Sequence, residues 1–280
     1  MKQETNDWIT GSEQELLEKA AAFITDTAYR AVEARGRFTM ALAGGSTPQA
    51  LYELLAGGIS ESRLTALGYP VPPDACRSAA DPGLVVLPWR HTLLFQGDER
   101  YVPASHPDSN FGMARRSLIS HISIPEEHVV RMPVESGDAA EDAGLYETRL
   151  RSLFRKPGEC SQDGFPVFDL VMLGLGDDGH TASLFPGDRV ALGERSRWVL
   201  AVDAPGGKPP GMRITLTLPV INEAAAAMFL VPASRHELAL SIREGRHPEL
   251  PSGMVRLPHG RLLWFVADNK PRGDVLKFVK

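Results

Sequence analysis

The chain has 280 residues, of which 43% are hydrophobic and 23% charged, a composition typical of globular proteins that bury a sizeable core. The net charge of −5 and the lack of a long basic run argue against nucleic acid as a partner. The polar N-terminal stretch does not resemble a signal peptide, and the apolar run 224–231 is too short to span a membrane, so we expect a cytoplasmic protein without membrane attachment.

The hydrophobic pattern in the first half of the chain predicts alternating helices and strands. Ser12 can cap a helix over 13–35, along which apolar residues recur at helical spacing. The expected elements that follow are a strand at 38–43, a helix at 49–55, a strand at 91–96, a helix at 110–121, a strand at 129–132 and a helix at 139–154. The stretch 57–90 is rich in glycine, proline, serine and alanine, with a short strand near 84–87, and we interpret it as a surface insertion.

The second half continues in the same style after a polar loop at 156–166. The expected elements are strands at 168–173 and 198–202, a loop at 205–212, an extended stretch at 213–218, a helical turn at 219–225, a strand at 226–231, a helix at 237–244, a strand at 262–267 and a closing segment at 270–278. Strands that alternate with helices imply a parallel sheet covered on both faces. The sequence therefore predicts a single α/β domain over residues 1–280 with a mainly parallel sheet.

Two glycines and two hydroxyls follow the first predicted strand. Gly44 and Gly45 let the backbone bend and approach a ligand closely. Ser46 or Thr47 can cap the next helix, and Pro48 is well tolerated in its first turn. Exposed amides and the helix dipole favour an anion here, but a plain strand–turn–helix junction has the same pattern. The motif GxxxxGK[ST] is absent, which excludes a nucleotide P-loop.

Charged residues follow two other predicted extended stretches. Arg100 could donate to a phosphate, while Asp98 and Glu99 could orient it or hold sugar hydroxyls; a surface loop with local ion pairs is the alternative. Lys208, on a proline-containing loop, and Arg213 could complete a phosphate site, or they could be ordinary surface cations.

The segment 174–187, GLGDDGHTASLFPG, carries the strongest chemical signal. Histidine has the pKa range that suits a general base, and a neighbouring carboxylate can orient its ring. We therefore interpret His180 and Asp178 as an acid–base pair and Asp177 as a solvated turn residue. A helix-capping aspartate followed by a structural histidine remains the alternative.

The same segment formally matches the dinucleotide fingerprint GxGxxG. Two observations argue against a nicotinamide cofactor. Asp177 and Asp178 would repel a pyrophosphate, and Pro186-Gly187 leaves almost no room for the helix that the fingerprint needs.

The two cysteines, Cys76 and Cys160, lie far apart and belong to no CxxC or Cys/His cluster. This spacing supports neither a disulfide framework nor structural zinc, and it fits a reducing cytosol.

Taken in order, the motifs resemble the 6-phosphogluconolactonases of the glucosamine-6-phosphate isomerase/6-phosphogluconolactonase superfamily. The segments that carry the resemblance are 43–48, 97–103 with Ser109-Asn110, 173–187, 208–210 and 213–222. The resemblance extends from about residue 13 to 267, and DGHTASLFPG is its most specific part. It implies a Rossmann-like domain, a monomer or weak dimer, that hydrolyses the sugar-phosphate lactone 6-phospho-D-glucono-1,5-lactone with no metal and no cofactor.

The resemblance also implies roles for individual residues. His180 is the base that activates water, and Asp178 is its partner. The implied substrate- and phosphate-binding residues are Gly44, Gly45, Ser46, Thr47, Asp98, Arg100, Asn110, Lys208 and Arg213.

Two departures from related sequences bear on function. Similar isomerases carry a glutamate just before the proline of the 180–186 loop, where this chain has Phe185, which favours hydrolysis over isomerisation or deamination. A lysine expected after the strand 226–231 is replaced by His236, for which Arg235 could compensate. A non-catalytic sugar-phosphate sensor on the same scaffold is a third possibility.

Overall fold

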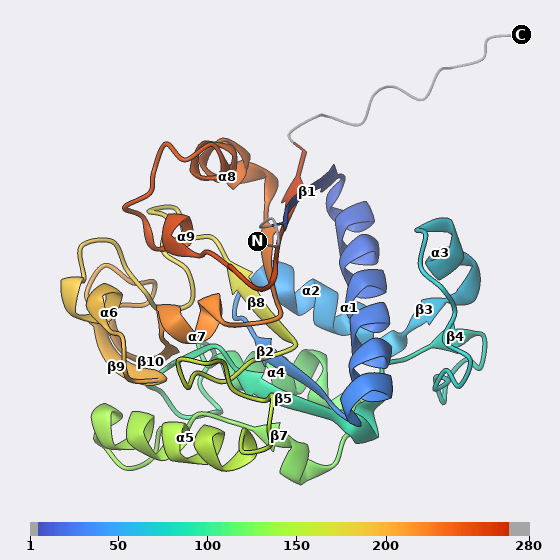
Figure 1. The fold of residues 1–280 in the computed structure, drawn as a ribbon, viewed down its shortest axis with the longest axis horizontal. Helices are drawn as coiled ribbons and strands as arrows, with labels where there is room; N and C mark the ends of the chain where they lie inside the picture. Colours follow the sequence, from blue (N-terminus) through green and yellow to red (C-terminus); the bar gives the residue numbers. More distant parts are fainter. Residues whose placement is uncertain (1–4, 269–280) are drawn as a thin grey trace, which may run out of the picture.

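A seven-stranded sheet runs through the middle of the protein, and every pair of neighbouring strands in it is parallel (Figure 1). The computed structural model describes residues 5–268. The strand order is β1-β12-β11-β8-β2-β5-β7. These strands are β1 (Thr5–Gly11), β2 (Phe38–Leu42), β5 (Thr92–Gln96), β7 (Val129–Val130), β8 (Leu170–Gly174), β11 (Ala226–Val231) and β12 (Arg261–Ala267). The predicted α/β fold with a mainly parallel sheet is confirmed.

Helices cover both faces of this sheet (Figure 1). Because side chains alternate along a strand, Met40 and Ala41 of β2 belong to two different core clusters. One cluster includes side chains of α1, α2 and α4, and the other includes side chains of α5, α7 and α8. The helices are α1 (Glu13–Arg35), α2 (Ser46–Gly57), α3 (Glu61–Ala66), α4 (Asn110–Ser117), α5 (Ala139–Leu153), α6 (Arg189–Gly193), α7 (Leu218–Asn222), α8 (His236–Arg243) and α9 (Pro251–Met254).

The ends of α1 follow from local chemistry and agree with the prediction. Ser12 accepts from the amide of Glu15, and the Glu15 carboxylate accepts from the amide of Ser12, which makes a capping box. Gly36, with φ of 76°, ends the helix in the left-handed conformation.

Three antiparallel strands, which form a second sheet, were not predicted as such. The strands β6 (Asp98–Arg100), β10 (Gly211–Leu216) and β9 (Val199–Ala204) pair in that order. The surface loop considered for 98–100 is wrong, because these residues form a strand, and the extended stretch begins at Gly211 within the predicted loop. A strand as short as β6 has no periodic pattern of its own, and its partner lies more than a hundred residues away.

Other boundaries differ for local reasons. The strand β1 was missed because the N-terminal segment is polar and pairs only along one side, with β12. The predicted helix 110–121 ends at Ser117, where Leu118 leaves the helical conformation, and a short 3₁₀ turn follows at Ile119–His121. The expected closing segment 270–278 lies outside the described residues.

The stretch 57–90 contains α3 and a two-stranded antiparallel sheet of β3 (Ile59–Ser60) and β4 (Leu84–Val85). Its buried residues Ile59, Leu64 and Val85 pack with Ala22 of α1 in a small separate cluster. The interpretation of this stretch as an insertion in a single domain stays a prediction.

The strand order reverses between β2 and β8, which lie side by side. From β2 the chain goes to β5 and β7 on one side, and from β8 it goes to β11 and β12 on the other. In open parallel sheets, ligands bind outside the carboxyl ends of the strands at such a reversal. The turns 43–48 and 174–180 follow these two strands, so the fold brings both motifs to this edge.

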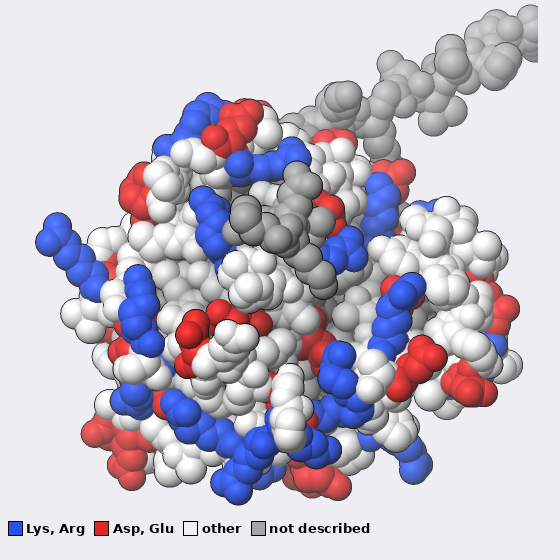
Figure 2. Space-filling view, in the orientation of Figure 1, with Lys and Arg blue, Asp and Glu red and all other residues white. Residues whose placement is uncertain are grey.

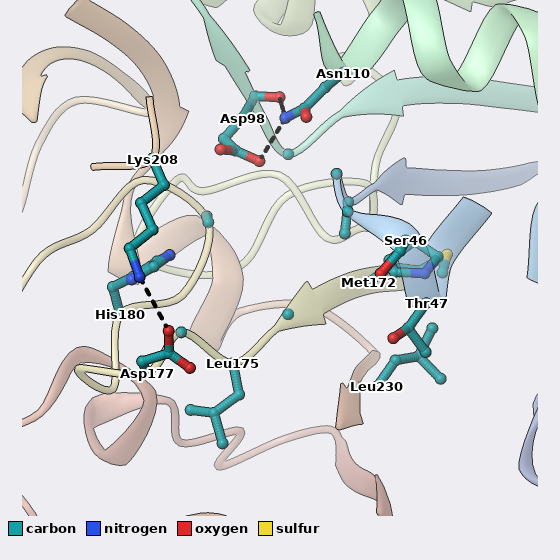
Figure 3. A pocket seen from close by; sticks show the side chains of 18 of the residues that line it. Ser46, Thr47, Asp98, Asn110, Met172, Leu175, Asp177, His180, Lys208 and Leu230 are labelled. Atoms are coloured by element: carbon teal, nitrogen blue, oxygen red, sulfur yellow. Dashed lines mark hydrogen bonds and ion pairs between the residues drawn. The ribbon is translucent and has the colours of Figure 1, made fainter. Parts of the chain in front are cut away.

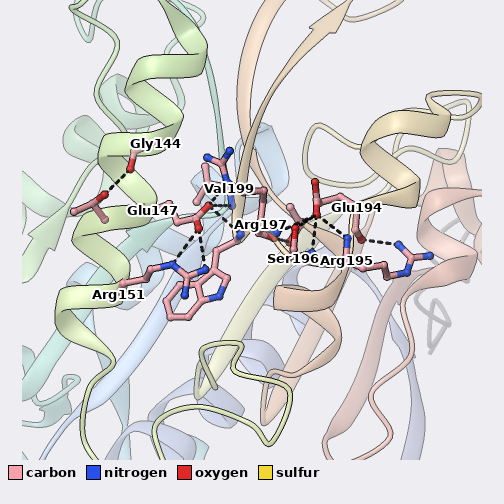
Figure 4. A network of polar contacts seen from close by, with 11 residues as sticks. Gly144, Glu147, Arg151, Glu194, Arg195, Ser196, Arg197 and Val199 are labelled. Atoms are coloured by element: carbon pink, nitrogen blue, oxygen red, sulfur yellow. Dashed lines mark hydrogen bonds and ion pairs between the residues drawn. The ribbon is translucent and has the colours of Figure 1, made fainter.

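Charged side chains are distributed over the surface, with basic groups along the lower edge near α5 interrupted by acidic ones (Figure 2). One buried network below this surface joins α5 to β9 (Figure 4). The Glu147 carboxylate accepts from Arg151, from Arg197 and from the amides of Trp198 and Val199. No helix of the described residues is long and apolar enough to cross a membrane.

The neighbouring Glu194 gives a pH-dependent prediction. Its carboxylate accepts from the amides of Arg197 and Ser196, which lower its pKa from an ordinary 4.5 to about 2 (Figure 4). A lowered folded-state pKa contributes stability that is complete above about pH 4.5 and is lost as the pH falls towards about 2. We expect Glu194→Gln to melt below the wild type at pH 7, with a difference that stays constant down to about pH 4.5 and narrows from there to pH 3.

Melting curves between pH 3 and pH 7 test this expectation. The matched control is Glu127→Gln, because Glu127 is exposed and, within residues 5–268, makes no side-chain hydrogen bond. A melting difference for Glu194→Gln that stays constant down to pH 3 would contradict the assignment.

Candidate active site

A cavity of about 400 Å³ opens at the carboxyl edge of the sheet, where the strand order reverses. Its walls come from the loops after β2, β5, β8 and β11 and from the connection between β9 and β10. All eleven residues proposed from the sequence as site residues line it. Figure 3 shows Ser46 and Thr47 at one side, Asp98 and Asn110 at another, and Lys208 with Asp177 at a third. The structure brings these residues together, while their individual roles stay predictions.

His180 and Asp178 form a close pair. The Nδ1 atom of His180 lies 2.5 Å from Oδ1 of Asp178, and the same oxygen accepts from the His180 amide at 3.0 Å. Burial alone would raise the pKa of Asp178, but the His180 amide and imidazole hold it below its ordinary value. The carboxylate therefore stays ionised at neutral pH and fixes the ring with Nε2 unblocked by this contact.

The turn that holds this pair requires glycine at two positions, at Gly176 for space and at Gly179 for backbone conformation. A Cβ on Gly176 would lie 2.0 Å from Nδ1 of His180, so only glycine leaves space for the ring in this position. Gly179 has a φ of 81°, in the left-handed region, and its carbonyl accepts from the amide and hydroxyl of Ser252 in α9. Ser252 is a supporting residue that the sequence did not indicate, because α9 is too short to show a periodic pattern.

Phe185 packs against His180, and Arg213 packs against Phe185. The Phe185 ring lies 4.6 Å from the imidazole, centroid to centroid, at an interplanar angle of 32°. The Arg213 guanidinium carbon lies 5.5 Å from the centroid of the same Phe185 ring. The position where the resemblance implies a glutamate in an isomerase is thus occupied by an apolar side chain in contact with the histidine.

The glycine–serine turn opens α2 without a side-chain cap. The N-cap is Gly45, with φ of 106°, and Ser46 is the first helical residue, so the expectation that Ser46 or Thr47 caps the helix is wrong. The amides of Ser46 and Thr47 have no carbonyl one turn earlier to bond within the helix. Gly44 is required for a different reason, because a Cβ there would lie 1.9 Å from Oδ1 of Asn110.

The carboxylates of Asp98 and Glu99 differ in position. Asp98 lines the cavity, and its carboxylate accepts from Ser183 Oγ at 2.6 Å and from Asn110 Nδ2 at 3.2 Å. Glu99 instead faces the start of α4, where it accepts from the amides of Asn110 and Phe111 at 2.7 Å each. Burial raises the pKa of Glu99. Glu99 therefore stabilises α4, and the suggestion that it contacts a ligand is not supported by its place.

Arg100 and Arg213 are cross-strand partners in the antiparallel sheet, and both line the cavity. Arg100 donates to the Asp108 carbonyl and Arg213 to the Pro209 carbonyl, but each Nε atom is buried and unpaired within the described part of the chain. No carboxylate of residues 5–268 forms an ion pair with either guanidinium. Burial lowers the pKa of Arg213, and the charge of Arg100 acts in the same direction. An anion bound here would be the negatively charged partner that neither guanidinium group has among these residues.

A second group of cations also lines the cavity. Asp177 pairs with Arg235 through Nε at 2.8 Å and with Lys208 through Nζ at 3.4 Å, so it is not simply a solvated turn residue. His236 turns away from the cavity, because its Nδ1 contacts the Ala267 carbonyl at 3.1 Å and its ring packs edge-on against Trp8. Arg235 lines the cavity instead.

Within residues 5–268, no group of three or more histidine, cysteine, aspartate or glutamate side chains could hold a metal ion. The predicted independence from metals and cofactors stays a prediction.

Comparison with known proteins gives a consistent result. Residues 11–264 match the family described as glucosamine-6-phosphate isomerases/6-phosphogluconolactonase. The chain is 36% identical to a 6-phosphogluconolactonase of Synechocystis, covering 91% of this chain and 92% of that protein, and 37% identical to one of Rattus norvegicus, covering 94% and 91%. The solved structure of the 6-phosphogluconolactonase from Trypanosoma brucei superposes with a TM-score of 0.73 at 27% identity, covering 95% of this chain and 96% of that one.

Proposed function

This chain belongs to the family of glucosamine-6-phosphate isomerases and 6-phosphogluconolactonases, and from that premise we propose that it hydrolyses 6-phospho-D-glucono-1,5-lactone to 6-phospho-D-gluconate. One observation carries the proposal. The His180–Asp178 pair opens into a cation-lined cavity and has Phe185, not an acid, packed against it.

In the proposed reaction, His180 is the general base. Its Nδ1–H donates to Asp178, which leaves the Nε2 lone pair to take a proton from water. The water oxygen bonds to the lactone carbonyl carbon, and the carbonyl oxygen becomes an oxyanion. A backbone amide of the cavity, or a cation there that does not hold the phosphate, would stabilise this negative charge.

The second step breaks the bond between the carbonyl carbon and the ring oxygen. The ring oxygen takes the proton that His180 accepted, which restores neutral histidine and leaves an open-chain acid. The new carboxylic acid then ionises to solvent. One water is consumed and one ester bond is broken.

The phosphate supplies binding energy at a distance from the reacting carbon. We assign it to the Gly45–Thr47 turn with Arg100 and Lys208, and Arg213 as a further cation. The unpaired Nε atoms of the two arginines support this assignment, because each has donor capacity that no described residue uses.

Isomerisation or deamination of an amino-sugar phosphate is the alternative within the family. It would need a second acid that supports His180 from the position before Pro186, and Phe185, which stands there, can neither give nor take a proton. A sugar-phosphate sensor without catalysis is the other alternative, and it would need the same cations but no water-activating pair.

The test is the decay of freshly prepared 6-phosphogluconolactone, with the spontaneous rate measured in buffer and subtracted. We expect the protein to accelerate the decay and to release no ammonia from glucosamine 6-phosphate. Ammonia release would favour the deaminase, and tight 6-phosphogluconate binding without accelerated decay would favour the sensor.

A further inference from the structure

Asp177, Arg235 and Lys208 come from three separate segments that meet at the cavity wall. Asp177 follows β8, Arg235 lies in the 3₁₀ turn after β11, and Lys208 lies between β9 and β10. One carboxylate thus contacts two cations through its two oxygens, as the dashed line from Lys208 to Asp177 shows in part (Figure 3). Both cations lower the pKa of Asp177, Arg235 more than Lys208.

Stability does not explain this arrangement. The Asp177 side chain is 65% exposed and that of Lys208 is 87% exposed. Exposed ion pairs typically contribute only about 0–1 kcal/mol. The carboxylate also takes no part in the turn itself, whose hydrogen bonds join Gly176 to Gly179 and His180 through the backbone.

The two contacts are unequal. The Nε atom of Arg235 lies 2.8 Å from the carboxylate, the length of a good charge-assisted hydrogen bond, while Lys208 lies 3.4 Å away. Among residues 5–268, the Arg235 side chain donates only through Nε and only to Asp177, which leaves its two terminal NH₂ groups without a partner in that part of the chain and able to bind a ligand as a fork. Arg235 is therefore anchored, and Lys208 is loosely held.

We propose that Asp177 is a positioning residue that holds Arg235 and Lys208 as an anion clamp, and that Arg235 binds the phosphate of the substrate. The inference rests on the proposed function, because the phosphate is the only charged group of the lactone. Asp177 keeps two mutually repelling cations close together before the substrate binds. When the phosphate arrives, Arg235 stays on Asp177 through Nε and presents its NH₂ groups, and Lys208 moves from Asp177 to the phosphate.

The Asp177→Asn variant tests the positioning role through the sign of its effect. Asparagine keeps the turn but removes a negative charge beside an anion site. The change in charge alone therefore predicts tighter phosphate binding. Positioning predicts the reverse, because Arg235 loses its anchor. We expect the dissociation constant of 6-phosphogluconate to rise about three- to tenfold, comparable to the net loss of one ordinary hydrogen bond, because Arg235 stays in place with less order.

Calorimetric titration with 6-phosphogluconate, inorganic phosphate and gluconate provides the readout. Phosphate-bearing ligands should weaken, and gluconate should be unaffected. Arg235→Gln should weaken the same ligands about tenfold, Arg235→Lys should restore part of the affinity, and Asp177→Asn should have little further effect in the Arg235→Gln background. In turnover, KM should rise more than kcat falls.

The matched control is Glu135→Gln, which removes a comparable exposed ion pair with Arg131, 2.6 Å long, outside the cavity. Its binding and turnover should equal those of the wild type. Unchanged or tighter binding by Asp177→Asn, or full additivity with Arg235→Gln, would overturn the clamp. A wild type that binds 6-phosphogluconate but does not hydrolyse the lactone would instead overturn the proposed function, since the binding comparison needs no turnover.

Discussion

The His180→Ala variant is expected to hydrolyse 6-phosphogluconolactone no faster than buffer does. The variant has no group at this place that can take a proton from water and return it to the ring oxygen. Positioned acid–base groups typically contribute about 10²- to 10⁴-fold to a rate. Because the lactone also opens unaided, a loss of that size brings the enzymatic increment below the spontaneous background.

The measurement is the lactone decay rate against enzyme concentration, whose slope should fall to zero. His180 is only partly buried, so the variant should keep the melting temperature of the wild type within a few degrees. His259→Ala is the matched control, because His259 is exposed and precedes β12 at the opposite edge of the sheet. Wild-type turnover by a folded His180→Ala variant would rule out His180 as the base.

The Gly176→Ala variant is expected to lose about 100-fold or more in activity, although it removes no proton-transferring group. Its methyl would lie 2.0 Å from Nδ1 and 2.2 Å from Cε1 of His180, which real atoms do not tolerate. The imidazole is the movable partner, so it must rotate away and break its 2.5 Å contact with Asp178. Displacements of about 1 Å in a catalytic geometry can cost about 10²-fold.

The control is Gly144→Ala in α5, away from the cavity, where an added Cβ meets nothing within 4 Å. Neither glycine has a positive φ, so alanine introduces no backbone strain at either position. We expect Gly144→Ala to keep its kcat and Gly176→Ala to lose it while both remain folded by circular dichroism. Equal activities of the two variants would contradict the assigned packing.

Local signals explain which parts of the fold were predictable. The ends of α1 at Glu13 and Arg35 and those of β11 at Ala226 and Val231 were found, since a capping box and an uninterrupted apolar run are visible within a few residues. The strands β1 and β6 were not found. Each becomes a strand only by pairing with a partner far along the chain, which no short window of sequence reveals.

The same distinction between local signals and distant contacts decides which parts of the site could be predicted. The residues after β2 and β8 could be placed together because the carboxyl ends of parallel strands share an edge. The number of residues after the strand 226–231 indicated that His236 replaces the expected lysine. The 3₁₀ turn at Ala233–Arg235 instead directs Arg235 to the cavity and His236 to Trp8. The contacts of Asp177 were also hidden, because its partners lie 31 and 58 residues away.

The lack of space for a Cβ atom at Gly44 restricts which substitutions the sequence can accept during evolution. The space that a methyl would need is filled by the Asn110 amide, whose other contacts hold Asp98. Neither position can change alone: a larger residue at 44 demands a smaller one at 110, and a smaller one at 110 leaves Asp98 short of a donor. Across descendants of this sequence, positions 44 and 110 should therefore be inherited as a pair, although they are far apart in the chain.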